Sequence, residues 1–355
     1  SSAASDVYKR QDMDSVWPAG VERIRNAVKS FDPKNNTVTL NDKTKIGYEI
    51  LIVASGLKLD WDAIEGLTDS LGHNAVTSNY NYDLAPYTWQ LVQEFQGKDA
   101  IFTMPGMPIK CAGAPQKAMY LSCDHWQKTG RLSGMNVSFC NAGPVLFGCA
   151  TYVPPLMKYV DKYGINLDFG HNLTKIDGAS KTAWFKVTKE GEEPQMIERK
   201  FDMIHVCPPQ CAPDFISKSP LANAGGWVDV DQETLQHTGF PNVFSLGDVA
   251  STPNAKTAAA ARKQAPIVAQ NVKAFMAGRE LKPLYDGYGS CPLTVEKGKI
   301  ILAEFGYGGK VMPSVPWDST KARRSAWMLK KTVLPKVYWG AMLKGREWLT
   351  RTTKA

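Results

Sequence analysis

The sequence predicts an α/β protein made of two Rossmann-like, doubly wound units. The first observation is an alternation of short apolar strands with helices, which is typical of a parallel sheet covered by helices. The second is an apolar strand over residues 242–246 that ends in Gly247-Asp248 and leads into an alanine-rich helix. The third is a length of 355 residues, which is enough for two or three domains.

The composition is that of a globular protein and excludes several other classes. Hydrophobic residues make up 43% and charged residues 21%, so disordered, collagen-like and disulfide-scaffold proteins are excluded. No apolar run reaches the roughly 18 residues that a membrane-spanning helix needs, and we expect no such helix. Residues 1–11 fit no element and no targeting pattern, so we expect them to be non-native and the chain to enter its fold midway.

The net charge of +8 is concentrated at the C-terminus. Ten basic residues and one acidic residue lie between 321 and 355, which gives this segment +9 and leaves −1 for the rest of the chain. A nucleic-acid-binding protein would carry its basic surface on the folded body, so we expect no nucleic-acid partner.

In the first half of the chain, the strands and helices alternate. Residues 20–57 predict short strands: residues 37–40 alternate polar with apolar side chains, and residues 48–54 form an apolar run that ends in Ser55-Gly56. The elements expected next are a helix over 84–97, a buried strand over 99–104, a helix near 115–128, a strand over 135–139, a helix near 151–163 and a strand near 165–169.

In the second half, the strand over 242–246 and a helix from Thr257 to about Met276 continue this pattern. Residues 285–292 predict a loop, and residues 300–305 predict a strand. The last 35 residues are basic and aromatic.

The motif Gly247-Asp248, followed by Lys256-Thr257 and an alanine-rich helix, is typical of flavoproteins. A strand that ends in Gly-Asp can place a carboxylate against the ribityl hydroxyls of FAD. The helix that follows directs its positive N-terminal end at the flavin. The alternative is an ordinary aspartate at a strand end. The run that ends at Ala54 and Gly56 supports the FAD interpretation, because small residues allow a cofactor to approach the backbone.

A second dinucleotide fingerprint is missing where a nicotinamide site would need one. The loop after residue 104 carries Pro105 and Pro108 in place of G-x-G-x-x-G. We therefore do not expect a nicotinamide cofactor to be a substrate. The glycine loop of a first FAD-binding unit is also absent from the sequence, and we expect an N-terminal stretch to be lacking.

Two of the seven cysteines are candidates for redox chemistry. Cys111 follows Lys110 and precedes a predicted helix, and a cation and a helix N-terminus both lower the pKa of a thiol. Cys291 lies in the predicted loop over 285–292. The alternative is a pair of unrelated buried thiols. The odd number of cysteines and their spacing favour an intracellular protein with free or catalytic thiols.

The remaining cysteines and the histidines predict no metal site. Cys207 and Cys211 are too far apart for a C-x-x-C pair, and Cys123 fits helix packing. We expect His205 to be an interior histidine, and no G-x-S-x-G motif indicates a serine nucleophile.

The C-terminal segment predicts a helix at a membrane surface. Its apolar and aromatic residues recur near helical spacing between basic residues, and Pro335 is expected to split it in two. These residues are Tyr338, Ala341, Met342, Trp348 and Leu349, beside Lys344 and Arg351. The alternative is a helix docked on the body. A flavoprotein without a nicotinamide partner needs another electron acceptor, and a quinone in the membrane would serve.

Five stretches of the chain resemble the sulfide:quinone oxidoreductase family, in particular its eukaryotic mitochondrial type. They are residues 110–117 (KCAGAPQK), 222–231 (ANAGGWVDVD), 256–260 (KTAAA), 285–293 (YDGYGSCPL) and 301–305 (ILAEF), and the resemblance extends over most of residues 20–345. It implies a two-dinucleotide-fold flavoprotein with FAD, peripheral to the mitochondrial inner membrane, or to the cytoplasmic membrane if the source is bacterial.

By this resemblance, Cys111 and Cys291 are the two redox cysteines, bridged in the resting enzyme. Sulfide would leave a persulfide on Cys291, Cys111 would react with the flavin, and ubiquinone would receive two electrons. Glutathione or sulfite would accept the sulfur. The residues expected to hold FAD are Val28, Ala54, Gly56, Gly247, Asp248, Lys256, Thr257, Ala258 and Ala259, and the quinone pocket is guessed at Phe305 and Trp339.

The expected domain organisation follows from the same resemblance. Residues 12–97 would be the remainder of the FAD-binding domain, 98–215 the second Rossmann-like domain, 216–285 a return to the first, and 286–355 the redox-cysteine loop and membrane segment. Two alternatives are a type II NADH:quinone oxidoreductase and an inactive membrane-associated flavoprotein. The first requires a glycine motif after residue 104, and the second predicts loss of Cys111 or Cys291.

Overall fold

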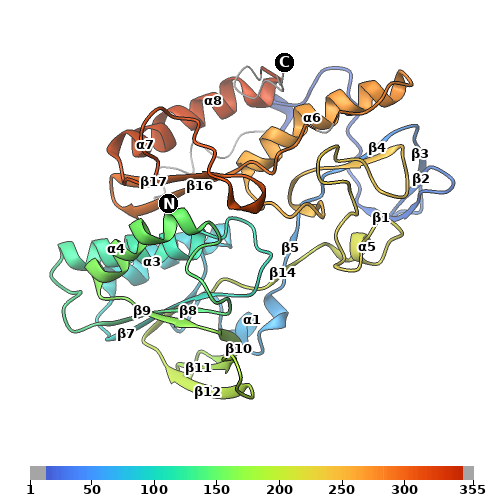
Figure 1. The fold of residues 1–355 in the computed structure, drawn as a ribbon. Helices are drawn as coiled ribbons and strands as arrows, with labels where there is room; N and C mark the ends of the chain where they lie inside the picture. Colours follow the sequence, from blue (N-terminus) through green and yellow to red (C-terminus); the bar gives the residue numbers. More distant parts are fainter. Residues whose placement is uncertain (1–12, 283, 347–355) are drawn as a thin grey trace.

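The computed structural model describes residues 13–282 and 284–346 and has the expected α/β architecture (Figure 1). The strands are β1 (Val28–Asp32), β2 (Thr37–Leu40), β3 (Lys45–Gly47), β4 (Leu51–Val53), β5 (Lys58–Leu59), β6 (Val76–Thr77), β7 (Asp99–Met104), β8 (Asn136–Asn141), β9 (Asn166–Phe169), β10 (His171–Asp177), β11 (Thr182–Val187), β12 (Gln195–Lys200), β13 (Met203–His205), β14 (Gln210–Cys211), β15 (Val243–Ser245), β16 (Gly289–Glu296) and β17 (Lys299–Phe305). The helices are α1 (Leu67–Ser70), α2 (Ala85–Glu94), α3 (Ala114–Lys128), α4 (Val153–Tyr163), α5 (Asp214–Ser217), α6 (Ala258–Met276), α7 (Arg324–Met328) and α8 (Leu334–Gly340).

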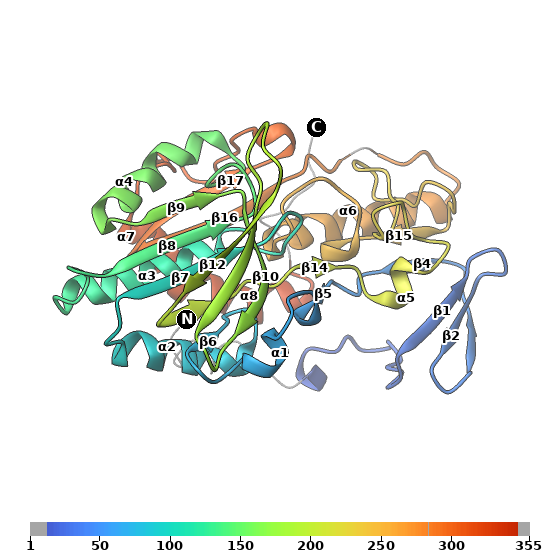
Figure 2. The same ribbon diagram turned by 90° about the horizontal axis from the view of Figure 1, so that it is seen from below.

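A five-stranded parallel sheet, in the order β6-β13-β7-β8-β9, is the centre of one unit. Alternate side chains of β7 and β8 point to opposite faces, as the pleat requires. Phe102 and Phe139 pack with residues of α3 and α4, whereas Ile101 and Cys140 pack with residues of the antiparallel sheet β10-β11-β12. Figure 2 shows this antiparallel sheet in front of the five-stranded sheet, with α3 behind it. Because β6 pairs with β13, this sheet includes residues before 98, which differs from the expected domain boundary at residue 97.

The other unit contains the parallel pair β4-β15, helix α6 and the antiparallel sheet β1-β2-β3. Strand β4 is shorter than the expected run over 48–54, and Ile52 is 48% exposed. The buried strand that the apolar run over 48–54 predicts is therefore not found over its whole length, because β4 pairs with β15 alone among the described strands. The short antiparallel pair β5-β14 lies between the two units (Figure 1).

The hairpin β16-β17 lies over α3 and includes residues 289–292 of the loop expected at 285–292, whereas residues 285–288 belong to no helix or strand (Figure 1). Within β16, Cys291, Leu293 and Val295 are buried in the core cluster that also contains residues of α3. Pro292 is tolerated because β16 pairs only with β17 among the described strands. Cys291 therefore belongs to a strand, and its placement in a loop was wrong.

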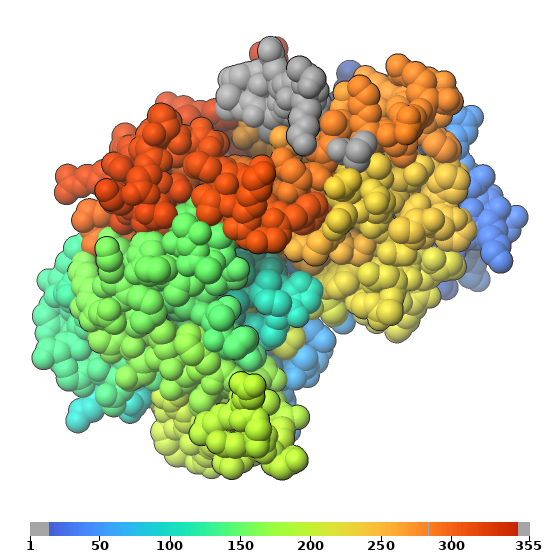
Figure 3. Space-filling model, viewed as in Figure 1, coloured from blue at the N-terminus to red at the C-terminus, as the bar shows by residue number. Residues whose placement is uncertain are grey.

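The C-terminal segment lies on this hairpin, and in the space-filling view it covers the top of the unit that contains the five-stranded sheet (Figure 3). Helix α7, a π-helical stretch (Leu329–Val333) and α8 follow one another without a break. The expected split at Pro335 is wrong, because this proline occupies the first turn of α8, where a missing amide is tolerated. Among residues 13–282 and 284–346, no helix has the length and apolarity to cross a membrane.

Some expectations fall on residues outside the described ranges. They are the non-native start at residues 1–11 and the contributions of Trp348, Leu349 and Arg351 to the C-terminal helix.

Candidate active site

A cavity of about 530 Å³ lies where the two units meet. It brings together most of the residues expected to hold a flavin, and it adds Cys111. The expected residues in its wall are Ala54, Gly56, Gly247, Asp248, Lys256, Thr257, Ala258 and Cys111. The wall also contains Asn79, Tyr80, Lys110, Ala114, Leu246 and Ala261.

The ends of β4 and β15 shape one side of this cavity. Gly56 and Gly247 both have positive φ, +72° and +75°, a conformation that glycine adopts without strain. A Cβ atom on Gly56 would meet no atom within 4 Å, so the conformation and not crowding favours glycine there. Helix α6 begins at the cavity, and the Thr257 hydroxyl caps it by accepting a hydrogen bond from the Ala260 amide at 3.2 Å.

The polar groups of the cavity fit a flavin. The Asp248 carboxylate is half-buried, and burial raises its pKa, while no hydrogen bond from the described residues reaches it. Lys256 Nζ donates to the carbonyls of Asp248 (2.7 Å) and Ala250 (3.0 Å). Burial lowers the pKa of Lys256 to about 8, opposed by the charge of Asp248. A carboxylate for sugar hydroxyls and a helix N-terminus for an anionic ring are what this cofactor requires.

Cys111 lies in the loop between β7 and α3, with an unusual φ of 50° for a non-glycine residue. Its amide donates to the Lys256 carbonyl at 2.8 Å, and its carbonyl accepts from the Ala114 amide at 2.7 Å. Its sulfur accepts a hydrogen bond from Lys117 Nζ at 3.1 Å. The loop thus places one thiol in the wall of the cavity and beside a lysine.

Cys291 reaches the same place from β16. Its side chain is buried and lies in hydrogen-bonding contact with Cys111, and both cysteines are free thiols. The approach depends on Gly113, because a Cβ atom there would lie 2.5 Å from the Cys291 sulfur and 2.4 Å from Leu293 Cδ2. The structure therefore brings together the two cysteines that the sequence singled out.

The pair is electrostatically asymmetric. A hydrogen bond from the Cys291 thiol holds the pKa of Cys111 well below its usual range, and the Lys117 ammonium lowers it further. The same contact and burial raise the pKa of Cys291. The neighbouring cation expected at Lys110 is found instead at Lys117, one turn into α3, because that turn directs its side chain back toward the loop.

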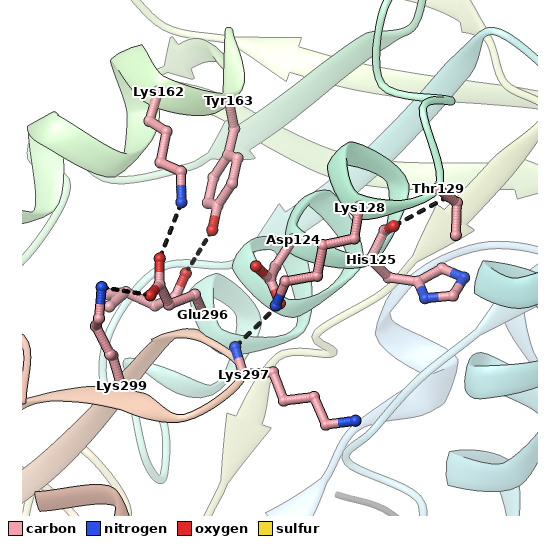
Figure 4. Close-up of polar contacts among 10 residues, drawn as sticks. Asp124, His125, Lys128, Thr129, Lys162, Tyr163, Glu296, Lys297 and Lys299 are labelled. Atoms are coloured by element: carbon pink, nitrogen blue, oxygen red, sulfur yellow. Dashed lines mark hydrogen bonds and ion pairs between the residues drawn. The ribbon is translucent and has the colours of Figure 1, made fainter. Parts of the chain in front are cut away.

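Polar contacts fix the tip of the hairpin to α3 and α4, as Figure 4 shows. Glu296 accepts from Lys162 Nζ at 2.9 Å and from Lys299 Nζ at 2.7 Å. The Lys297 amide donates to the buried Asp124 carboxylate at 3.0 Å, and Lys128 Nζ lies 2.7 Å from the same oxygen. These contacts hold β16, and with it Cys291, against the helix that follows Cys111.

Other expected site residues lie elsewhere. Val28 is in β1 and packs against the core of the unit that contains β4 and β15. Ala259 does not line the cavity. Phe305 packs edge-on against Phe147 with ring centroids 5.6 Å apart, whereas Trp339 packs edge-on against its neighbour Tyr338 in α8. The structure therefore does not bring Phe305 and Trp339 together in a described pocket.

The functional residues that the sequence analysis missed are Gly113, Lys117 and Tyr80. The first two lie within the motif at residues 110–117, so spacing along a helix could have indicated them. Tyr80 comes from a distant loop, and no local pattern marks it.

Cys123 and His205 lie in the interior, away from the cavity. Cys123 packs within α3, as expected, and burial raises its pKa. His205 is an interior histidine, as expected: its Nε2 accepts from the Asn79 amide at 2.9 Å, and burial lowers its pKa to about 4. Within the described ranges, no group of histidine, cysteine or acidic residues could hold a metal ion.

The chain is similar to curated proteins over nearly its whole length. The mitochondrial sulfide:quinone oxidoreductase of Dictyostelium discoideum is 43% identical over 353 residues, which cover 98% of this chain and 77% of that protein. The mitochondrial sulfide:quinone oxidoreductase of Mus musculus is 37% identical over 93% of this chain and 73% of that protein. No family model matches the chain.

Solved structures share the fold at lower identity. The sulfide:quinone oxidoreductase of Aquifex aeolicus has a TM-score of 0.73 and 18% identity, covering 91% of this chain and 76% of that chain. The water-forming NADH oxidase of Lactobacillus brevis has a TM-score of 0.52 and 17% identity, covering 80% of this chain and 59% of that chain. The chain therefore shares its α/β fold with these two structures. The identity to the curated relatives goes further and shows that the chain belongs to the sulfide:quinone oxidoreductase family.

Proposed function

We propose that this chain oxidises sulfide at the Cys111–Cys291 pair and passes two electrons through a flavin to a quinone. The observation that carries this proposal is the place of Cys111. It lies in the wall of the cavity that fits a flavin and in contact with both Cys291 and Lys117. Membership of the family supports the same reaction.

The cysteines perform the sulfur chemistry. Starting from their disulfide, hydrosulfide attacks the Cys291 sulfur, the S–S bond breaks, and its electron pair goes to the Cys111 sulfur. The products are a persulfide on Cys291 and a thiolate on Cys111, which the Lys117 ammonium stabilises. An acceptor nucleophile then takes the outer sulfur, and loss of two electrons from the two remaining thiolates closes the disulfide again.

FAD is the flavin that we propose for the cavity. Asp248 would bind its sugar hydroxyls, and the start of α6 at Thr257 and Ala258 would face its pyrimidine edge. When bound, the flavin would supply a two-electron acceptor for the thiolates and a two-electron donor for the quinone. Lys256, which lies in the same wall and is buried, would add positive charge beside it.

The finer assignments are proposals as well. Ubiquinone is the proposed quinone, and glutathione or sulfite is the proposed sulfur acceptor. The mitochondrial relatives support a mitochondrial location, and we propose the surface of the inner membrane as the place where the chain would meet a lipid-soluble quinone.

The direct test uses cysteine variants. Cys111→Ser and Cys291→Ser should each abolish sulfide-dependent reduction of a soluble ubiquinone analogue. Cys211→Ser, at a half-buried thiol outside the cavity wall, is the matched control and should retain turnover. Retained turnover in either active-site variant would contradict the two-cysteine reaction.

A type II NADH:quinone reductase is the other reaction that this fold could perform. The loop after β7 carries Pro105 and Pro108 where a dinucleotide fingerprint would lie, and this disfavours NADH. The same assay with NADH in place of sulfide decides: quinone reduction by NADH alone would replace the sulfide proposal.

The C-terminal segment is proposed to bind the membrane surface. Met328, Val333 and Tyr338 are exposed large apolar residues on it, and Lys331 and Lys336 are exposed between them. Aromatic and apolar groups beside lysines suit the headgroup layer of an anionic membrane. Part of the segment docks on the body, since Ala326 packs against Ile300 and Leu302 of β17.

Substitution is a cleaner test of this proposal than deletion, because deleting the segment would also uncover β17. The triple variant Met328→Ser, Val333→Ser and Tyr338→Ser should no longer sediment with vesicles of phosphatidylcholine and cardiolipin, while keeping turnover with a soluble quinone. Sedimentation equal to that of the unmodified chain would refute the proposal that these residues bind the membrane surface.

A further inference from the structure

We propose that Tyr80 and Gln210 are positioning residues, which hold the loop at Cys111 so that its sulfur faces Cys291. Both act on the backbone next to the reacting sulfur: the Tyr80 hydroxyl hydrogen-bonds the carbonyls of residues 110 and 111, and the Gln210 side chain accepts from the amide of residue 110. The inference rests on the proposed function, because it assigns these residues to the same cysteine pair.

The conformation of Cys111 needs support from its surroundings. A φ of 50° is unfavourable for a residue with a Cβ atom, and such conformations persist only where neighbouring contacts over-determine them. At the amide and carbonyl of Cys111, the partners are the Lys256 carbonyl and the Ala114 amide. These two contacts alone leave the preceding residue, Lys110, without a restraint at its own amide and carbonyl.

Tyr80 and Gln210 supply that restraint from two sides. The Gln210 side-chain oxygen accepts from the Lys110 amide at 2.7 Å. The Tyr80 hydroxyl donates to the Lys110 carbonyl at 3.1 Å and lies 3.3 Å from the Cys111 carbonyl. The peptide groups before and after Cys111 Cα are thereby held, and the direction of its Cα–Cβ bond toward Cys291 is fixed.

Both residues are themselves fixed by buried contacts. The Asn79 amide donates to the buried His205 Nε2 at 2.9 Å, and the Tyr80 amide donates to the Ser78 hydroxyl at 3.1 Å. Gln210 is buried and pairs with Leu59 through the β5-β14 link between the two units. The hydrogen bonds of Tyr80 and Gln210 therefore connect the loop at Cys111 to the β5-β14 pair between the two units. A thiol that is positioned this accurately closes a disulfide at high effective concentration.

The test measures the disulfide itself and needs neither sulfide nor a quinone. The full chain is equilibrated without oxygen in glutathione buffers. Formation of the Cys111–Cys291 bond there converts one oxidised glutathione into two reduced molecules. The protein is then quenched with acid, alkylated and assayed by mass spectrometry for the fraction of this disulfide.

Tyr80→Phe and Gln210→Leu should each lower the equilibrium constant for closing the disulfide by about tenfold or more, because misplacement of a reacting group by 1 Å is costly. Tyr87→Phe is the matched control, since this half-buried hydroxyl accepts from the Ala75 amide away from the cysteines. It should leave the constant unchanged even where it lowers the melting temperature.

Every result of this measurement either supports the inference or overturns it. An unchanged constant in the folded variants would overturn the inference, and circular dichroism shows which variants fold. If one variant does not fold, the other decides alone. A failure of sulfide oxidation in the unmodified chain would contradict the proposed function but would leave this measurement of the disulfide intact.

Discussion

Lys117 carries the charge that stabilises the Cys111 thiolate. Its Nζ lies 3.1 Å from the Cys111 sulfur, and the Cys291 thiol donates to the same atom. Both contacts favour the thiolate over the thiol, so they lower the pKa of Cys111. Below that lowered pKa the sulfur is protonated and unreactive, and above it the thiolate is present.

Lys117→Gln should therefore raise the pKa of Cys111. In the reduced chain, the pH at which iodoacetamide alkylates Cys111 at half its maximal rate should move upward, while the rate at high pH stays the same. Mass spectrometry of the Cys111 peptide gives both quantities. Lys158→Gln, at an exposed lysine on α4, should leave the profile unchanged. An unmoved profile in Lys117→Gln would show that the ammonium does not set this pKa.

Gly113 allows the two sulfurs to meet. A methyl group there would collide with the Cys291 sulfur and with Leu293, and β16 would have to move. Gly113→Ala should lower sulfide-dependent turnover by roughly tenfold to a hundredfold. Gly106→Ala, where a Cβ atom meets nothing within 4 Å, is the control in the same loop. Equal turnover of the two variants would contradict the close approach.

At the residue scale, the sequence could identify the cysteines and the Gly247-Asp248 motif, because their chemistry lies in local spacing. It could not identify Tyr80, since the contact of Tyr80 with residues 110 and 111 depends on the way two distant loops fold together. The sequence also indicated Lys110 and not Lys117 as the cation beside Cys111, because adjacency in sequence does not show which way a side chain points.

At the scale of elements, the hairpin β16-β17 determines where Cys291 lies. Its tip is fastened by Asp124 and Glu296, and its middle packs on α3. Lys162 and Lys299 lower the pKa of Glu296, although burial opposes them. The stability that these ion pairs contribute is present above the ordinary glutamate pKa and is lost as the pH falls through the lowered one.

Asp124→Ala should destabilise this fastening. The substitution leaves the Lys297 amide without its acceptor, which costs about 1–3 kcal/mol in the free energy of unfolding. Urea unfolding followed by tryptophan fluorescence measures the loss. Asp161→Ala, at an exposed position on α4, should change the free energy by less than about 0.5 kcal/mol. Equal losses in the two variants would refute the role of Asp124.

The strands expected over 99–104 and 135–139 agree with β7 and β8 because both strands are buried on both faces of the five-stranded sheet. Residues 285–292 were expected to form a loop because glycine and proline interrupt the apolar pattern. Packing on α3 overrides that local signal, and Pro292 is accommodated because β16 has one strand partner among the described residues.

At the scale of the molecule, the candidate active site forms where the two units and the hairpin β16-β17 meet. Asp248 and Lys256 come from one unit, Cys111 from the other, and Cys291 from the hairpin that crosses α3 (Figure 1). The order of these elements in the sequence predicts the fold class. The convergence itself depends on long-range packing, which a single sequence does not display.

The central claim is that sulfide delivers electrons to a flavin through the Cys111–Cys291 pair. The most direct measurement is an anaerobic titration of the flavin-loaded chain with sulfide, in the presence of sulfite as the sulfur acceptor, followed by visible absorption. We expect stoichiometric sulfide to bleach the oxidised flavin band and a quinone to restore it. A flavin band that does not respond to sulfide but bleaches with NADH would contradict the claim.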